Sequence, residues 1–313
     1  MFSGLSRSRV LLFALCMAAV GLGVTTWRNA SLYFLWRSSL CGCNKCLIEG
    51  ASWFRTLLNE APKPFLSTMN KTSEDVFNWW THLQSERHNF TFFNSTVDDL
   101  FEVFPPVPDV VESSPDLCRT CAVVGNSVNL NGSQYGHLID LHHIVIRMNG
   151  GRTKGYESDV GAKTTHHVMY PESAVPLDNN THLVLFPFKI KDLLWLLQMF
   201  DPGMKSDNNR QMMANKDLVM ILNPAFMKYV HKRWLANNGK YPSTGFLALV
   251  LSLQLCDEVS VFGFGADSDG NWSHYFEKLR NKRLRTGPHP GSVEYEVIRL
   301  LHRMQKITLY KGQ

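Results

Sequence analysis

The sequence predicts an α/β fold in which a mainly parallel sheet of seven strands is flanked by helices and preceded by an N-terminal membrane anchor. Three features support this prediction: a globular composition, a charge-free apolar run near the N-terminus, and short apolar segments that alternate with helical patterns after Cys118. Of the 313 residues, 44% are hydrophobic and 19% are charged, which excludes a disordered, collagen-like or coiled-coil chain. The net charge of +5 comes without a polybasic block, so no nucleic-acid partner is expected.

The apolar run extends from Val10 to Val24 and is preceded by Arg7 and Arg9. A cleavable signal peptide is the alternative interpretation, because its apolar stretch can be as short as roughly 7–15 residues. We favour an uncleaved anchor that leaves both arginines in the cytoplasm. The expected organisation is a cytoplasmic tail (1–9), a transmembrane signal-anchor (10–27), a stem (28–50) and a lumenal domain (51–313).

N-glycosylation sequons support the lumenal placement. Chance would give about two to three Asn-X-Ser/Thr sequons in a chain of this composition. The sequence has more, and they begin at Asn29, Asn70, Asn89, Asn94, Asn131, Asn179 and Asn271. We expect Asn271 to be unused, because a glycan there would obstruct the site described below.

The cysteines outside the apolar run form an even set: Cys41, Cys43, Cys46, Cys118, Cys121 and Cys256. An even set in an oxidising compartment predicts three disulfides, although spacing alone does not choose among the possible pairings. A zinc cluster built from the two cysteine-rich segments is the alternative, and the lumenal context makes it the weaker one.

The expected elements follow in chain order. The segment from Trp53 to Phe104 has a helical pattern, with Ser73 as an N-cap, and Pro105 opens a linker. Residues 201–216 are expected to form a loop. The expected strands are Ala122–Val124, Ile144–Met148, His166–Tyr170, Leu183–Phe186, Leu218–Leu222, Val259–Phe262 and Ile307–Tyr310. The expected later helices are Asp192–Met199, Pro224–Ala236, Thr244–Leu255 and Val293–Met304.

Small or amide residues follow three of these strands, where a parallel sheet binds its ligands. They are Asn126 and Ser127 after the first strand, Asn149 after the second, and Gly265 after the sixth. Such residues suit a polar ligand held close to the backbone. Ordinary turns are the alternative for each of them taken alone.

One helix start is a candidate anion site. Tyr241 and Pro242 precede Ser243-Thr244-Gly245, which open an apolar helix whose free N–H groups would attract a phosphate or carboxylate. Simple capping is the alternative. The chain has no G-x-x-x-x-G-K-[ST] and no G-x-G-x-x-G, which excludes a P-loop and argues against a dinucleotide site.

Two histidines lie in polar segments beside this region. His274 follows the glycine-rich strand end, and His289 precedes the last helix. Their place makes them candidates for acid–base chemistry, although a lone histidine is more often structural. The pairs His142-His143 and His166-His167 are expected inside strands, as core or edge residues.

Four segments in this order resemble the motifs of the animal sialyltransferases. Residues 118–172 (CRTCAVVGNS…MYPE) resemble the large motif and residues 241–265 (YPSTGF…VFGFG) the small motif. His274-Tyr-Phe-Glu277 resembles the third motif, and His289 with Glu294 the very small motif. Within that family the chain is most similar to the β-galactoside α-2,3-sialyltransferases that act on Gal-β1,3-GalNAc of O-glycans, through the Cys41 cluster, Trp79-Trp80 with Gln84, and Thr165 to Glu172.

The resemblance implies a glycosyltransferase-A-like variant fold, a type II Golgi membrane protein, CMP-sialic acid as donor, a galactose-terminated O-glycan as acceptor, and inversion by direct displacement. It implies that His289 is the general base and that His274 contacts the departing phosphate. Gln84 and Tyr241 would position the acceptor galactose. The residues implied for the donor are Asn126, Ser127, Asn149, Ser243, Thr244, Gly245 and Gly265. The implied disulfides are Cys41–Cys46, Cys43–Cys118 and Cys121–Cys256. The last of them would join the large motif to the small motif, at loops that share the donor.

The chemistry agrees with these roles, since the donor already carries a phosphate leaving group. The protein must activate a hydroxyl, which a neutral histidine does, and stabilise a phosphate charge, which a helix N-terminus does. Asp267-Ser-Asp269 imitates a metal-binding D-x-D motif, but the family works without metal, so neither a metal nor another cofactor is expected. A lectin-like protein that binds sialylated glycans without turnover is the rival function, and the presence of both histidines argues against it.

Overall fold

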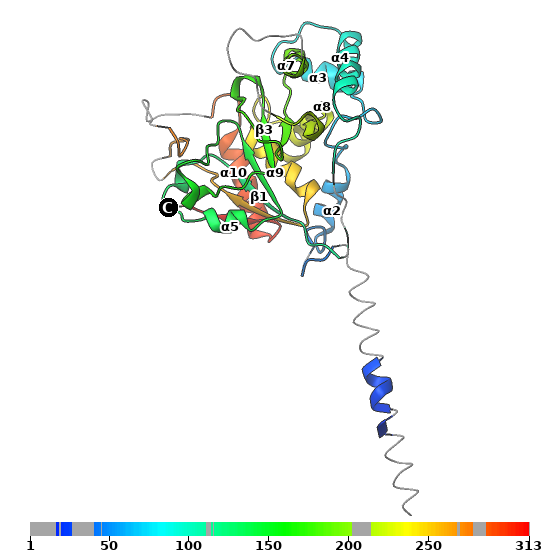
Figure 1. The fold of residues 1–313 in the computed structure, drawn as a ribbon, viewed down its shortest axis with the longest axis vertical. Coiled ribbons are helices and arrows are strands. Elements are labelled where there is room, and N and C mark those ends of the chain that lie inside the picture. Colours follow the sequence, from blue (N-terminus) through cyan, green and yellow to red (C-terminus); the bar gives the residue numbers. More distant parts are fainter. Residues whose placement is uncertain are drawn as a thin grey trace, which may run out of the picture.

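The structure is a computed structural model that describes residues 17–18, 20–26, 41–44, 46–110, 114, 116–201, 214–267, 270–277 and 286–312. Its centre is one seven-stranded sheet of order β5-β4-β3-β2-β1-β6-β7, and every pairing in it is parallel (Figure 1). The predicted seven-stranded parallel sheet is therefore confirmed. The strands are β1 (Thr120–Val124), β2 (Ile144–Met148), β3 (His166–Met169), β4 (His182–Leu185), β5 (Val219–Ile221), β6 (Glu258–Phe262) and β7 (Thr308–Tyr310).

Helices flank the sheet, and α3, α4 and α7 gather at one end of the molecule (Figure 1). The α-helices are α2 (Ser52–Asn59), α3 (Glu74–Thr81), α4 (Phe90–Val103), α5 (Gly136–Asp140), α6 (Glu157–Val160), α7 (Ile190–Phe200), α8 (Pro224–Tyr229), α9 (Thr244–Leu255) and α10 (Gly291–Arg303). A π-helical turn, η4 (Val230–Trp234), continues α8. Short 3₁₀ turns are η1 (Val128–Leu130), η2 (Pro171–Ser173) and η3 (Lys216–Leu218).

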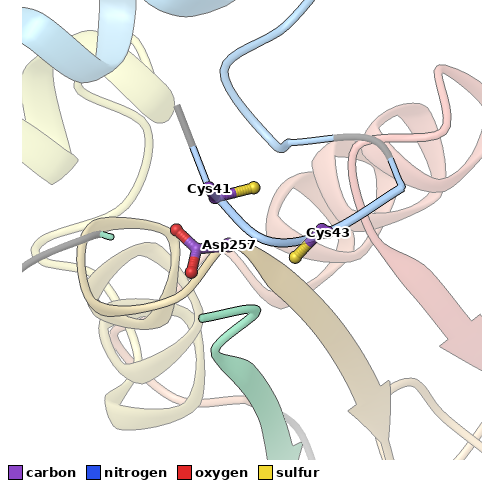
Figure 2. A group of neighbouring side chains, drawn as sticks. All are labelled: Cys41, Cys43 and Asp257. Atoms are coloured by element: carbon purple, nitrogen blue, oxygen red, sulfur yellow. The ribbon is translucent and has the colours of Figure 1, made fainter. Parts of the chain in front are cut away.

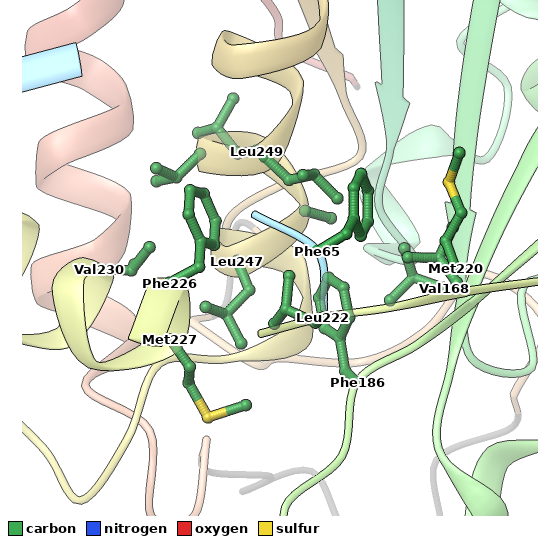
Figure 3. Packing of buried hydrophobic residues seen from close by; sticks show 14 of the residues in the cluster. Phe65, Val168, Phe186, Met220, Leu222, Phe226, Met227, Val230, Leu247 and Leu249 are labelled. Carbon is green, nitrogen blue, oxygen red and sulfur yellow. The ribbon is translucent and has the colours of Figure 1, made fainter. Parts of the chain in front are cut away.

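The helix α9 forms the centre of the core. Almost all of its side chains are buried, which its sequence TGFLALVLSLQL allows because apolar residues occupy every face. It lies against β1, β2, β3 and β6. Leu247 and Leu249 pack in one cluster with Phe65 and Phe226 (Figure 3). This packing holds the start of α9 in a fixed place relative to the ends of the strands.

A second, smaller cluster covers part of the sheet near α5 and α6. Its members are Ala122, Val124, Leu130, Ile139, Val145, Val160, Phe262 and Tyr275. The central strands are therefore covered on both faces, and for this reason they read as continuous apolar runs in the sequence.

Three local predictions need correction. The segment from Trp53 to Phe104 holds three helices separated by turns. Ser73 does stand at the N-cap of α3, but its hydroxyl donates to the carboxylate of Asp75 at 2.5 Å and makes no capping bond to the backbone. His142-His143 lies in the turn before β2, because the Nδ1 of His142 donates to the carbonyl of Leu138 at 3.0 Å and closes the end of α5.

The expected N-terminal anchor lies partly outside the described residues. Residues 17–18 and 20–26 of the expected anchor (10–27) are helical, and its other residues are not described. In the described ranges no helix is both long and apolar enough to cross a membrane. Residues 202–213, most of the expected loop at 201–216, also lie outside the described residues.

The six cysteines form the disulfides Cys41–Cys46, Cys43–Cys118 and Cys121–Cys256, which is the pairing that the resemblance implies. Cys41 and Cys43 lie close to the carboxylate of Asp257 (Figure 2). Their sulfurs are disulfide-bonded, so they are not thiolate ligands, and Asp257 accepts from the Arg119 backbone N–H at 2.9 Å. The zinc alternative therefore lacks its ligands in this structure.

The position of Cys121–Cys256 differs from the expected one. Cys121 lies early in β1, and Cys256 is the residue at the C-terminal end of α9. The loops after β1 and before α9 are at the opposite ends of these elements. The disulfide therefore ties β1 to α9 away from those loops and does not clamp them directly.

Candidate active site

A cavity of about 330 Å³ lies where β1, β2 and β6 end and α9 begins. The residues that the sequence assigned to the donor and to acid–base chemistry all line it. They are Asn126, Ser127, Asn149, Ser243, Thr244, Gly245, Gly265, His274 and His289. These residues meet in one place although Asn126 and His289 are more than 160 positions apart in the chain.

The loop after β1 is fixed by bonds to the loop after β6 and to the end of β2. The Ser127 hydroxyl donates to the carbonyl of Gly265 at 2.8 Å, and the Asn126 side-chain amide donates to the carbonyl of Met148 at 3.1 Å. A Cβ added at Gly125 would lie 2.3 Å from the carbonyl oxygen of Gly263, so the two loops pass too closely for any side chain there. The wall of the cavity is consequently preformed by backbone groups.

Asn149 has an unusual backbone conformation directly after β2. Its φ is +53°, in the left-handed region that asparagine tolerates better than most residues. The Nε2 of His167 donates to the Asn149 carbonyl at 2.7 Å, and the Ser173 hydroxyl donates to its Oδ1 at 3.0 Å. With the side-chain oxygen engaged, the Asn149 amide NH₂ is the group left to a ligand.

The start of α9 is held by a buried carboxylate from α10. Ser243 caps the helix, since its hydroxyl oxygen accepts from the Phe246 N–H at 3.1 Å. The same hydroxyl donates to Glu294 Oε2 at 2.6 Å, and the Ser243 N–H donates to Glu294 Oε1 at 2.7 Å. Burial raises the pKa of Glu294, and the two bonds from Ser243 oppose that rise. The first turn of α9 thus keeps a fixed direction toward the cavity.

His289 has one ring nitrogen engaged. Its Nδ1 faces the carbonyl of Tyr241 at 3.2 Å, and because a carbonyl only accepts, Nδ1 carries the proton. In the neutral ring the lone pair is then on Nε2. Burial lowers the pKa of His289 below its ordinary value, and the bond to Tyr241 only partly opposes this. The residue is therefore a neutral proton acceptor at neutral pH.

His274 has a different environment. It is exposed, and its Nδ1 donates to the carboxylate of Glu277 at 2.8 Å, while its ring stacks on Phe276 with 5.3 Å between centroids. A short antiparallel bridge joins its backbone to Ser127. With Nδ1 facing Glu277, the other ring nitrogen, Nε2, is the one left to meet a ligand in the cavity that His274 lines.

The two residues expected to bind the acceptor do not line the cavity itself. The Tyr241 ring packs edge-on against His289, with 4.9 Å between centroids, and lies 5.2 Å from the ring of Phe188. Gln84 is exposed after α3 and its Oε1 accepts from Lys189 Nζ at 3.3 Å. They lie along a surface that adjoins the cavity through Tyr241.

The segment Asp267-Ser-Asp269, which imitates a metal-binding D-x-D motif, is only partly described, because Asp269 lies outside the described residues. The Oδ1 of Asp267 accepts from the Asn271 N–H at 2.8 Å, and its Oδ2 accepts from the Asn271 side chain at 3.3 Å. Asp267 therefore stabilises the turn that leads to Trp272.

Sequence reasoning missed several residues of this cavity. Glu294 was identified only as part of a motif, and Tyr170, Trp272 and Tyr295 were given no role, although all four line the wall. A carboxylate in the first turn of a helix that starts beside a candidate site was the available signal for Glu294. A Cβ at Gly265, whose φ is +100°, would lie 2.8 Å from the Tyr295 ring.

Comparison with known proteins now decides the family. The family model described as glycosyltransferase family 29 (sialyltransferase) matches residues 65–306. The chain belongs to this family. It is therefore a sialyltransferase, and no support for the lectin alternative comes from its relatives.

Individual relatives cover most of this sialyltransferase. It is 43% identical over 283 residues to a protein of Gallus gallus named CMP-N-acetylneuraminate-beta-galactosamide-alpha-2,3-sialyltransferase 1, a match that covers 87% of this chain and 82% of the relative. The Homo sapiens protein of the same name is 41% identical, with 87% and 83% covered. A crystal structure of a mammalian sialyltransferase superimposes with a TM-score of 0.77 at 41% identity, covering 88% of this chain and all of that one. A mammalian sialyltransferase in complex with Gal-beta-1-3GalNAc-ortho-nitrophenol gives a TM-score of 0.76 at 41% identity, with coverage of 87% and 100%.

Proposed function

We propose that this sialyltransferase transfers sialic acid from CMP-sialic acid to the 3-hydroxyl of terminal galactose in Gal-β1,3-GalNAc chains of glycoproteins. Glycolipids that end in the same disaccharide are the second acceptor class. The linkage and the acceptor follow the names of the α-2,3-sialyltransferase relatives and the acceptor analogue bound to one structural relative. This proposal rests mainly on one observation: His289, whose Nε2 has no hydrogen-bond partner among the described residues, lines the same cavity as the N-terminus of α9.

The reaction is a single displacement with inversion. His289 Nε2 accepts the proton of the galactose 3-hydroxyl as its oxygen attacks the anomeric carbon of sialic acid, and the bond from that carbon to the CMP phosphate oxygen breaks. A positioned general base contributes about 10²–10⁴-fold. The departing phosphate gains negative charge, which His274 and the free N–H groups of α9 stabilise.

The donor is held by groups that converge on the cavity. Asn126, Ser127 and Asn149 bind the nucleotide, and Ser243, Thr244 and Gly245 present the start of α9 to the phosphate. Gly265 lies against the donor, where its lack of a side chain leaves room. Gln84 and Tyr241 position the acceptor galactose on the surface beside His289.

In the cell we propose a single-pass type II Golgi membrane protein with residues 1–9 in the cytoplasm, 10–27 in the membrane, 28–50 as a stem and 51–313 as the lumenal catalytic domain. The disulfides and sequons agree with an oxidising lumen. That Asn271 carries no glycan stays a prediction. Its side chain contacts Asp267, and it precedes Trp272 on the cavity wall.

The experiment that tests this function incubates the lumenal domain with CMP-sialic acid and a panel of galactosides, and reads the linkage of the product. We expect α-2,3-sialylated Gal-β1,3-GalNAc, and we expect transfer to continue in excess chelator, since His274 and α9 carry the charge compensation. Transfer that stops with chelator and returns with manganese would instead assign Asp267 and Asp269 as ligands. Product on another hydroxyl would reject the proposed acceptor geometry.

A further inference from the structure

The turn that carries Gln84 is attached to the start of α7 by a charged residue that the proposed mechanism does not use. Lys189, the residue before α7, directs its ammonium group to three oxygens. Its Nζ donates to Gln84 Oε1 at 3.3 Å and to Glu172 Oε1 at 2.7 Å, and lies 3.2 Å from Asp192 Oδ1. Its side chain is only 21% exposed, so the ammonium is held in this group of oxygens.

A second contact fixes the same turn independently. Glu86 Oε2 accepts from the N–H of Ile190, the first residue of α7, at 2.8 Å. Burial would raise the pKa of Glu86, but hydrogen bonds from the backbone and side chain of His88 and from the Ile190 N–H outweigh it and bring the pKa to about 2. The carboxylate is thus ionised at every working pH. The Glu86 carboxylate therefore holds this turn against the start of α7 independently of the contact between Gln84 and Lys189.

The contact also decides how the Gln84 amide is oriented. An ammonium group has three donors and no acceptor, so only the amide oxygen can face it. The Gln84 NH₂ then points away from Lys189, and in the described part of the chain it has no hydrogen-bond partner. It can donate to an oxygen of a ligand, and it cannot accept from a hydroxyl.

The start of α7 also reaches the proposed base. The ring of Phe188, next to Lys189, lies 5.2 Å from that of Tyr241, which in turn packs on His289 at 4.9 Å. The Phe188 N–H donates to Asp192 Oδ2 at 2.8 Å. One short segment thus supports Gln84 on one side and the aromatic neighbours of His289 on the other.

We propose that Lys189 is a positioning residue for the acceptor sugar. By holding the Gln84 amide oxygen it turns the amide NH₂ outward, so that Gln84 recognises a hydroxyl or ring oxygen of the galactoside as a hydrogen-bond acceptor. This inference rests on the acceptor role proposed for Gln84. Glu172 and Asp192 hold the Lys189 ammonium in place.

The test is a double-mutant cycle with Lys189→Met and Gln84→Ala in the full-length protein, using Gal-β1,3-GalNAc as acceptor and CMP-sialic acid as donor. Each single change is expected to raise the acceptor KM by about 2- to 10-fold, the effect of one hydrogen bond, and to leave the donor KM unchanged. The double variant is expected to match Gln84→Ala, because Lys189 acts through Gln84. Lys189→Arg, which keeps the charge and the donors, should restore part of the acceptor affinity.

Lys228→Met is the matched control. Lys228 in α8 is also largely buried and pairs with the Asp75 carboxylate at 2.8 Å, but it has no contact with Gln84. It should leave both KM values unchanged. The inference would be overturned if Lys189→Met lowered kcat in proportion to a loss of folded protein. It would also be overturned if the increases in acceptor KM of the two single variants multiplied in the double variant.

Gln84→Glu tests the orientation without touching Lys189. A carboxylate at this exposed position still pairs with Lys189 but has no NH₂ to offer, so the acceptor KM should rise at least as much as with Gln84→Ala. A Gln84→Glu enzyme with the original acceptor KM would overturn the orientation. Wild-type protein that transfers to no galactoside would instead reject the proposed function. Wild-type transfer with an unaffected Gln84→Ala acceptor KM would reject the role of Gln84, and with it that of Lys189.

Discussion

His289→Ala separates a catalytic base from a structural histidine. The substitution removes the Nε2 lone pair, while the bond that is lost on the other nitrogen is a single one to the Tyr241 carbonyl at 3.2 Å. If the general base is worth about 10²–10⁴-fold, kcat should fall by at least about 100-fold. CMP affinity should be largely retained, because the contacts proposed between α9 and the phosphate do not involve this ring.

The pH dependence of the wild-type enzyme gives a second magnitude. An unperturbed histidine titrates near pH ~6.5, so a base of that kind would lose about tenfold in its neutral form between pH 7.5 and 5.5. Burial lowers the pKa of His289. The neutral form is then favoured further into the acid range, and the loss of kcat attributable to His289 over this interval should be smaller than about tenfold. The acid limb should lie below pH ~6.5.

The assay measures kcat at saturating donor and acceptor from pH 5 to 8, together with CMP affinity and the thermal midpoint of each variant. His137→Ala is the control, since His137 is an exposed histidine of α5 that is not among the residues lining the cavity. A well-folded His289→Ala enzyme with near wild-type turnover would refute the assignment of the base. An acid limb whose midpoint lies above pH ~7 would refute the effect of burial.

Three further predictions follow from other contacts. Glu294→Gln should raise the donor KM about tenfold, because one charge-assisted bond to Ser243 is lost at the start of α9; unchanged CMP binding in calorimetry would contradict this. Replacing Cys121 and Cys256 together by serine should lower the free energy of unfolding by about 5 kcal/mol, because the disulfide closes a loop with a sequence separation of 135. Denaturant titration measures this loss, and a value below about 1 kcal/mol would contradict the expected restriction of the unfolded chain. Burial lowers the pKa of His167 to about 4, so His167 binds a proton more readily in the unfolded chain. Its contribution to stability should be complete above pH ~6.5 and should fall by about 3 kcal/mol as the pH drops to ~4. His167→Gln should make the loss of stability over this interval smaller by that amount, and an unchanged loss in that variant would contradict the role of His167.

The sheet could be predicted closely because of where its strands lie. A strand covered on both faces reads as an unbroken apolar run, and β2 was predicted with its observed bounds, Ile144–Met148. The same holds for α9, Thr244–Leu255, whose N-cap Ser243 and apolar interior are both local signals. The turn at His142 was misread because a local side-chain bond to the end of α5 competed with the strand pattern.

Contacts between distant segments could not be predicted from one sequence. Glu294 and Ser243 are 51 positions apart, and Lys189 and Gln84 are 105 apart. Nothing local in either pair indicates its partner. What the sequence did provide was the set of residues at strand ends, because the parallel sheet brings those ends to one edge whatever the intervening loops do.

The same geometry explains why the Cys121–Cys256 disulfide should stabilise the fold without acting on the cavity. β1 runs toward the cavity and α9 runs away from it, so Cys121 near the start of β1 meets Cys256 at the end of α9. The two elements form a frame that the disulfide closes at one end, while Ser243 and Ser127 face the ligand at the other. Because α9 is packed on β1, β2 and β3 along its length, loss of the bond should weaken the fold much more than it weakens donor binding by the protein that remains folded. We therefore expect the variant without Cys121 and Cys256 to bind CMP with nearly wild-type affinity per folded molecule, when affinity is measured below its lowered thermal midpoint. A loss of affinity larger than the loss of folded protein would contradict this and would mean that the disulfide also shapes the cavity.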